Sequence, residues 1–173
     1  ESSLLRYKPE KPNPLRVDPP GAITQMPSPS YIGHIHVFSD EKYEEMVDFY
    51  VKFFGGEITA INPGNPMTFI TYDDFDHRVV IMDMKGLGTK PERPVVGYSH
   101  LAFGYQSLGE VLFIYKRMKE WDFPAPIWTV NHGNSTSFYY KDPDGNQLET
   151  MVDNYSAIET KVYKQHYQFS EEF

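Results

Sequence analysis

The chain has 173 residues, of which 40% are hydrophobic and 16% aromatic, and its formal net charge is −8. That length allows one domain with a sizeable core, and the negative charge argues against nucleic acid or an anionic membrane as partner, because both reward an excess of Lys and Arg. Cysteine is absent, so disulfides, zinc–thiolate sites and a cysteine nucleophile are excluded, and any metal must be held by histidine and carboxylate.

The first 30 residues differ in composition from the rest of the chain. They are rich in proline and poor in apolar periodicity, and segments 8–14 and 18–20 are unsuited to helix or central strand. We interpret residues 1–30 as an arm along the surface or across a partner subunit, or equally as a loosely ordered tail. No signal peptide and no apolar stretch of membrane-spanning length is visible, so we expect a cytoplasmic protein.

Residues 31–84 predict a β-α-β-β-β unit. Residues 31–38 alternate as a strand, with His34 and His36 on one face and apolar side chains on the other. Apolar residues then recur at helical spacing over 40–54. Further strands are predicted over 57–62, 67–72 and 77–84.

The same order of elements restarts after a glycine- and proline-containing linker over 85–94. A strand over 96–103 carries His100, at the place that His34 holds in the first unit. A helix is predicted over 107–121, and strands over 126–130, 135–140 and 147–152. The sequence therefore predicts an internal duplication of topology, with modules 31–84 and 96–155 forming one domain over 31–155 and a polar, aromatic tail over 156–173.

The segment 131–149, NHGNSTSFYYKDPDGNQLE, combines a strand, a tight turn and a second strand. Pro143 pre-sets φ in the turn and Gly145 supplies a positive φ. Glu149 lies in an otherwise apolar stretch, where a buried carboxylate is costly unless it is paired or bound to a metal.

Two adjacent β-α-β-β-β units can curl their sheets around one half-open cavity. We therefore predict an α+β fold in which the modules form a half-open barrel around a metal site. His34 and His100 would face the cavity from equivalent strands, and Glu149 would enter from a terminal strand. Two imidazoles and one carboxylate on one face suit Fe(II) that binds a bidentate substrate and O2. Taken alone, each histidine is better explained as a buried ring hydrogen-bonded to the backbone, and it is the three residues together, at duplicated positions, that indicate a metal site.

Three segments carry a family resemblance: GHIHV over 33–37, SHLAF over 99–103 and YYKDPDGNQLE over 139–149. Together they resemble the vicinal oxygen chelate superfamily, which includes glyoxalase I, bleomycin-resistance proteins, fosfomycin-resistance enzymes and type I extradiol ring-cleaving dioxygenases. The resemblance covers about residues 31 to 155 and implies the paired-module fold.

Further positions are similar to the extradiol dioxygenases of the catechol 2,3-dioxygenase type. Segment 77–81 resembles the strand with their acid–base histidine, and 131–133 resembles the loop with a second active-site histidine. The resemblance implies that His77 acts as general base and acid and that His132 and Tyr139 contact substrate oxygens. It also implies that Fe(II), or alternatively Mn(II), is bound by His34, His100 and Glu149. His36 shares the face of His34, so the ligand assignment could shift by two residues.

The expected function is that of an Fe(II)-dependent extradiol dioxygenase, an oxidoreductase that cleaves a catechol-like aromatic diol with O2. The alternatives are a metal-dependent isomerase, lyase or cyclase of the same superfamily, or a metal-free protein that binds an aromatic compound. A homodimer is expected from the resemblance. The familiar ring-cleaving enzymes often carry two paired-module domains, whereas this chain has one. Some aromatic residues could sandwich a substrate ring, although core packing is favoured for most of them: Phe69, Phe103, Trp128, Phe138 and Tyr140.

Overall fold

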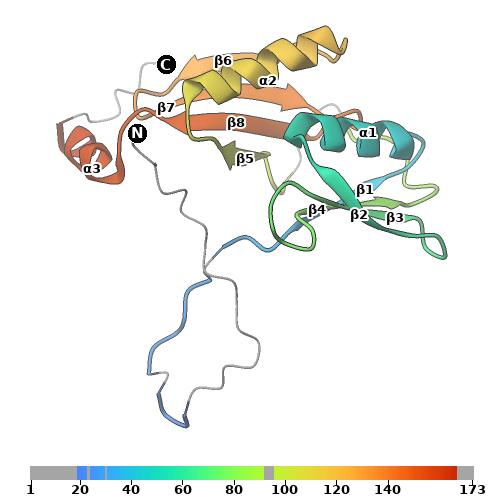
Figure 1. Ribbon diagram of the computed structural model, residues 1–173, viewed down its shortest axis with the longest axis horizontal. Coiled ribbons are helices and arrows are strands. Elements are labelled where there is room, and N and C mark those ends of the chain that lie inside the picture. The colour runs from blue at the N-terminus through green and yellow to red at the C-terminus, as the bar shows by residue number, and fades with distance from the viewer. Residues whose placement is uncertain (1–18, 23, 30, 92–95, 167–173) are drawn as a thin grey trace.

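The computed structural model describes residues 19–22, 24–29, 31–91 and 96–166 (Figure 1). The predicted arm over 1–30 and the end of the predicted tail lie largely outside these residues. The described part contains two four-stranded mixed sheets with helices packed against them. The predicted α+β class is confirmed, and the two sheets do not join into a closed barrel.

The first module contains one helix and one sheet with the strand order β1-β4-β3-β2. Strand β1 runs parallel to β4, and the other neighbours are antiparallel. The elements are β1 (Ile35–Ser39), α1 (Tyr43–Phe54), β2 (Glu57–Asn62), β3 (Met67–Thr71) and β4 (Val79–Asp83).

The second module repeats this arrangement with the order β5-β8-β7-β6 and β5 parallel to β8. The predicted duplication is therefore confirmed. The elements are β5 (His100–Gly104), α2 (Leu108–Glu120), β6 (Trp128–Asn131), β7 (Ser135–Lys141) and β8 (Gln147–Asp153), followed by α3 (Ala157–His166).

Helix α1 is set by its sequence at both ends. Two glutamates lie in its first turn and Lys52 in its last, which complements the helix dipole. Gly55 follows in the left-handed conformation, and its N–H bonds back to the carbonyl of Lys52. Between these ends, an apolar stripe buries four large side chains: Met46, Phe49, Tyr50 and Phe53.

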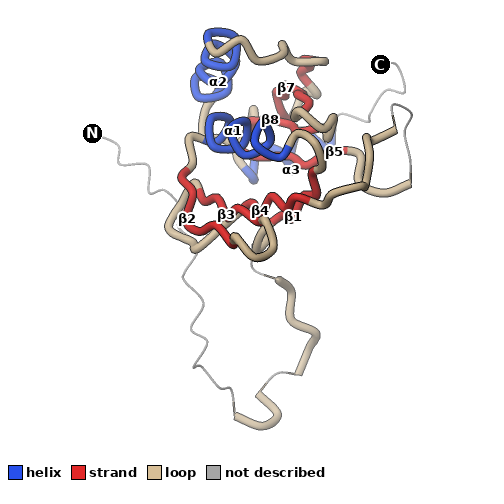
Figure 2. The backbone as a smooth tube through the Cα atoms, turned by 90° about the vertical axis from the view of Figure 1, so that its right-hand side faces the viewer, coloured by secondary structure: helices blue, strands red, loops and turns tan. Residues whose placement is uncertain are grey.

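Helix α1 lies between the two sheets (Figure 2), and its apolar stripe packs against both of them. On the first sheet it joins one core cluster with Ile70, Val79 and Ile81. On the second sheet the same cluster contains Tyr140 and Leu148, and the rings of Phe53 and Tyr140 lie 5.2 Å apart. Helix α1 therefore lies between the two sheets, and it contacts one face of each.

Strand alternation then fixes what the other faces carry. Val79 and Ile81 point toward α1, so Val80 between them points away from it, and so does its cross-strand neighbour His36. Tyr140 and Leu148 also point toward the core, so Tyr139 and Glu149 lie on the opposite face of the second sheet. The histidine- and carboxylate-bearing faces are thus the two faces that α1 does not cover.

Several strands begin later than predicted. Strands expected from residues 31, 77 and 96 begin at Ile35, Val79 and His100. The reason is that ladder pairing starts only with the pairs Ile35–Val79 and His100–Gln147. His34 and His77, expected inside strands, therefore lie just before them.

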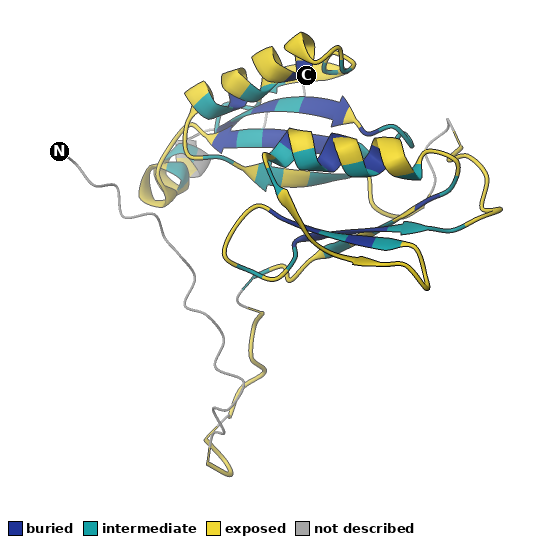
Figure 3. Ribbon diagram, turned by 45° about the vertical axis from the view of Figure 1, so that its right-hand side comes forward, coloured by how far each residue is buried: buried dark blue, intermediate teal, exposed yellow. Residues whose placement is uncertain are grey.

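Burial is concentrated on the inner side of α1, on strands β3 and β4 and on strands β7 and β8, whereas β2 is exposed along its whole length (Figure 3). No helix among the described residues has the length and apolar character needed to cross a membrane.

A hydrogen bond from Tyr50 to Asp142 links the two modules inside the core. The Tyr50 hydroxyl donates to Asp142 Oδ2 over 3.0 Å, and burial raises the pKa of both groups.

We expect Tyr50→Phe to lower the free energy of unfolding by about 1–3 kcal/mol, because a buried carboxylate loses a donor. Urea denaturation measures this. Tyr115→Phe is the control, since this hydroxyl makes no hydrogen bond within the described residues; an equal loss in both variants would contradict the prediction.

Candidate active site

The centre of the second module's uncovered face is a pair formed by His100 and Glu149. Strands β5 and β8 are parallel neighbours with Ala102 opposite Glu149, so His100 lies on the same face one pleat earlier. His100 Nε2 is 3.0 Å from Glu149 Oε2. The Glu149 side chain is only 8% exposed, and the imidazole of His100 gives this buried carboxylate a polar partner.

Tyr139 lies directly across the ladder from Glu149. Its ring meets the ring of His100 edge to face, with centroids 5.3 Å apart, and its hydroxyl is 3.3 Å from His132 Nε2. Burial, and then the charge of Glu149, raise the pKa of Tyr139 above its usual value. Tyr139 therefore remains a neutral phenol that can donate a hydrogen bond at neutral pH.

Trp128 completes this group from strand β6. It is paired in register with Tyr139, and the two rings are stacked with centroids 5.0 Å apart. Its ring also meets His132 edge to face at 5.7 Å. Trp128 is half-exposed, so one aromatic surface remains open beside Tyr139 and His132. Phe103, Phe138 and Tyr140 instead pack on the core side, as favoured for most of the aromatic residues.

A short turn holds His132 in place. The backbone N–H of His132 donates to the Ser135 carbonyl, and Asn131 Oδ1 accepts from the N–H of Gly133. Asn154 donates to Asn131 Oδ1 and to the Gly133 carbonyl. The turn is thus tied to the end of β8, and sequence reasoning missed Asn154 because no local pattern links it to residue 131.

The first module contributes a separate group around His34 and His77. Their ring centroids are 4.8 Å apart, and the ring of His77 lies 5.2 Å from that of Phe69. His77 Nδ1 is 2.6 Å from Asp76 Oδ2, so the hydrogen bond to Asp76 uses Nδ1 and not Nε2. Sequence reasoning missed Asp76, although it directly precedes His77. His36 contacts Phe38 instead, with centroids 5.2 Å apart.

All six predicted site residues fall into these two groups: His34 and His77 in the first module, and His100, His132, Tyr139 and Glu149 in the second. Within the part of the chain that the structure describes, no three His, Cys, Asp or Glu residues are close enough to hold one metal ion. The physical reason is the position of α1, which turns the two faces away from each other. The ligand set His34, His100 and Glu149 stays a prediction.

The donors in each group nevertheless suit a divalent ion. His100 Nε2 and Glu149 Oε2 already lie together in a buried setting, and imidazole with carboxylate is a donor set for Fe(II) and Mn(II). His34 is exposed and presents an unburied imidazole on the other face. A cavity of about 550 Å³ between α1 and α2 contains none of these residues, so it is not part of this site.

Comparison with known proteins agrees with the fold and the motifs. A profile of the Glyoxalase/Bleomycin resistance protein/Dioxygenase superfamily matches residues 31–150. Biphenyl-2,3-diol 1,2-dioxygenase 3 of Rhodococcus globerulus is 32% identical over 131 residues, covering 75% of this chain and 67% of that protein. Biphenyl-2,3-diol 1,2-dioxygenase 2 of the same organism is 31% identical over 122 residues, covering 70% of this chain. The chain spans 62% of the length of that second relative.

Solved structures share the fold at lower identity. A glyoxalase/bleomycin resistance protein/dioxygenase domain from Frankia has a TM-score of 0.63 and 15% identity, covering 73% of this chain and 100% of that one. A lactoylglutathione lyase from Agrobacterium tumefaciens has a TM-score of 0.54 and 24% identity, covering 72% and 94%. A fosfomycin resistance protein from Listeria monocytogenes has a TM-score of 0.55 and 20% identity, covering 73% and 96%.

Gly133 is the most constrained residue of the turn that holds His132. Its φ is +84°, and a Cβ atom there would overlap the Tyr163 hydroxyl of α3. We expect Gly133→Ala to destabilise the protein by at least about 1–2 kcal/mol, the usual penalty for an L-residue in the left-handed region. Urea denaturation measures this. Gly104→Ala is the control, because its Cβ would meet no atom within 4 Å and its φ is not positive. Equal unfolding free energies for the two variants would show that Gly133 is not constrained in this way.

Proposed function

The chain belongs to the Glyoxalase/Bleomycin resistance protein/Dioxygenase superfamily, and from that premise we propose that it is an Fe(II)-dependent extradiol dioxygenase. It would insert O2 into a catechol-like aromatic diol and cleave the ring. The observation that carries this proposal is the buried His100–Glu149 pair with the Tyr139 and His132 polar groups beside it. The names of the two Rhodococcus relatives support the same reaction class.

His34, His100 and Glu149 are the residues proposed to hold the ion, with Mn(II) as the alternative to Fe(II). When bound, such an ion supplies adjacent positions for two vicinal oxygens and lowers their proton affinity, which is what a catechol-like diol requires.

The remaining residues would bind the diol and move its proton. The neutral Tyr139 phenol would donate a hydrogen bond to a substrate oxygen. His132, whose Nε2 lies beside the Tyr139 hydroxyl, would contact the same oxygen. His77, oriented through Nδ1 by Asp76, would exchange a proton with the substrate hydroxyl at Nε2. The open surface of Trp128 would stack on the aromatic ring.

The separation of the two groups suggests how a complete site would form. In one chain, α1 packs on both sheets and keeps the His34 face and the Glu149 face apart. Two copies related by a two-fold axis can place the first module of one copy against the second module of the other. We therefore propose a homodimer with two equivalent sites, each built from both copies. The exposed apolar side chains on these faces, Phe38 and Trp128, favour such burial.

Co-expression of two inactive variants tests this arrangement directly. We expect His34→Ala and Glu149→Ala each to lose ring cleavage and stoichiometric Fe(II) binding when expressed alone. Co-expressed with different tags, the two variants should recover roughly a quarter of wild-type activity, because half of the dimers are mixed and each mixed dimer has one intact site. The measurements are formation of the yellow ring-opened product from catechol and 2,3-dihydroxybiphenyl after anaerobic Fe(II) loading, with oxygen uptake.

His36→Ala is the matched control for the ligand assignment. It removes an imidazole from the same face while leaving His34 in place, so it should keep Fe(II) binding and activity. Loss of activity in His36→Ala with retention in His34→Ala would move the ligand by two residues. No recovery in the co-expressed pair, with active wild type, would place the site within one chain. Wild-type protein that binds Fe(II) but consumes no oxygen with any diol would refute the dioxygenase proposal.

A further inference from the structure

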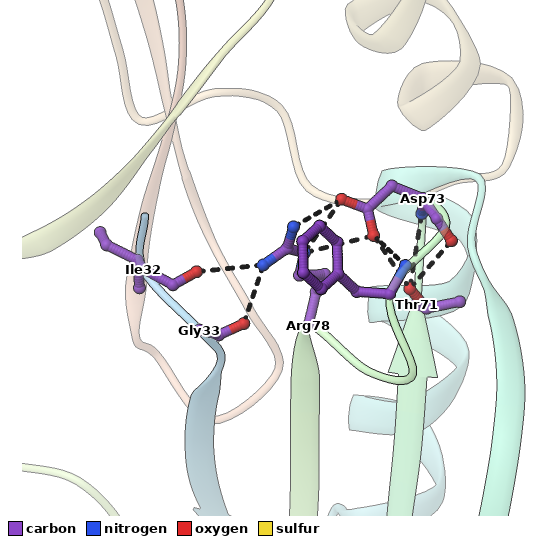
Figure 4. Close-up of polar contacts among 6 residues, drawn as sticks. Ile32, Gly33, Thr71, Asp73 and Arg78 are labelled. Atoms are coloured by element: carbon purple, nitrogen blue, oxygen red, sulfur yellow. Dashed lines mark hydrogen bonds and ion pairs between the residues drawn. The ribbon is translucent and has the colours of Figure 1, made fainter. Parts of the chain in front are cut away.

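Arg78 lies directly before β4, and only 8% of this charged residue is exposed (Figure 4). A buried guanidinium is costly unless its donors are hydrogen-bonded, and these donors are used. Nε donates to both carboxylate oxygens of Asp73 over 3.2 and 2.9 Å, and Nη2 donates to Oδ2 over 2.9 Å. Nη1 donates to the carbonyls of Ile32 and Gly33 over 3.1 and 3.0 Å.

Two aromatic rings cover this ion pair. The guanidinium carbon lies 3.7 Å from the ring centroid of Phe75 and 5.3 Å from that of Tyr31. The two rings also contact each other, with centroids 5.0 Å apart. Stacking on aromatic faces and forked hydrogen bonding are properties of Arg that Lys does not share. The residues Tyr31, Asp73, Phe75 and Arg78, with the two carbonyls, are called the Arg78 clamp below.

The clamp joins two segments of the first module. One segment ends at Gly33, directly before His34, and the other runs from Asp73 to the residue after His77. Neither histidine lies within a strand, because β1 begins at Ile35 and β4 at Val79. Two backbone bonds lie directly beside the histidines: the N–H of Ile35 donates to the Arg78 carbonyl over 2.9 Å, and the N–H of Arg78 donates to the Ile70 carbonyl over 2.8 Å. Backbone pairing thus fixes the residues after the histidines, and the clamp fixes the residues around them.

We propose that Arg78 is a positioning residue that holds the rings of His34 and His77 against each other. It touches neither ring in this role and acts through the backbone of Ile32, Gly33 and the 73–77 segment. The catalytic consequence rests on the proposed function, whereas the structural consequence, a fixed His34–His77 ring pair in the metal-free protein, does not.

The ring pair itself is the measurement that tests the proposal. In metal-free protein labelled at histidine, wild type should give a ring-to-ring nuclear Overhauser effect between His34 and His77, assigned with His34→Gln and His77→Gln. Arg78→Lys should lose this signal while the rest of the spectrum remains that of a folded protein, because Lys keeps the charge but lacks the forked hydrogen-bond donors of the guanidinium. Asp73→Asn, which keeps Arg78 and removes the carboxylate, should weaken the same signal and covers the case that Arg78→Lys does not fold.

Two control variants separate positioning from general stability. Arg117→Lys changes an exposed Arg that also pairs with a glutamate and stacks on a phenylalanine, and it should leave the ring signal unchanged. Tyr50→Phe destabilises the core without touching the clamp, and it should also keep the signal. A folded Arg78→Lys protein that retains the His34–His77 signal would overturn the proposal.

Metal binding gives a second readout. Isothermal titration with Fe(II) should show a 10- to 100-fold weaker affinity for Arg78→Lys than for wild type, as found when groups that orient metal ligands are removed. If wild type binds no metal, the proposed function fails while the ring signal still decides the role of Arg78. A third outcome is that Arg78→Lys loses the ring signal but binds Fe(II) with an affinity within two-fold of wild type. His34 would then bind the metal without the clamp, and the proposed role of Arg78 in metal binding would be overturned.

Discussion

The packing of helix α1 against both sheets determines where the chemistry of this protein lies. Each of its large buried side chains contributes about 1.5–3 kcal/mol through removal from water. Bringing the His34 face and the Glu149 face together within one chain would require α1 to leave the space between the sheets and expose Met46, Phe49 and Phe53. That would cost on the order of 10 kcal/mol, which is as large as the whole stability of a typical domain. Association with a second copy meets no such cost, because it buries surface that is already exposed.

Alternation along single strands allows each sheet to serve the core and the site at once. On β7, Tyr140 packs against Phe53 of α1 while Tyr139 contacts His100 on the other face. On β8, Leu148 is fully buried in the core and Glu149 contacts His100 on the other face. A one-residue slip of either strand would exchange these roles, so the same hydrophobic burial that stabilises the fold also fixes the register of the site. Asp142 lies in the turn between the two strands, and the hydrogen bond that it accepts from Tyr50 further stabilises this register.

Periodicity and turn chemistry were sufficient to predict the strands of the described residues, α1 and α2, and the duplication, because these depend on residues close in sequence. The starts of β1 and β4 were predicted too early, since alternation continues through His34 and His77 although ladder pairing does not. The packing of α1 on the second sheet could not be predicted, because an apolar stripe shows that a helix face is buried but does not identify the surface against which it packs. The Arg78 clamp was missed for a related reason: its carbonyl partners lie 45 and 46 residues away and have no sequence signature.

The two halves of the proposed site are held by different means, and this has a consequence for binding. Tyr139 and Glu149 lie on the central strands β7 and β8, which have a ladder on each side, and His100 begins the edge strand β5, which pairs with β8. His34 and His77 lie outside the strands, and in our proposal they are held by the Arg78 clamp. The entropy lost on ordering a ligand set is smaller when its members are already fixed. The second module therefore presents a preorganised carboxylate–imidazole pair, and most of the remaining ordering required to complete the site falls on the segment around His34.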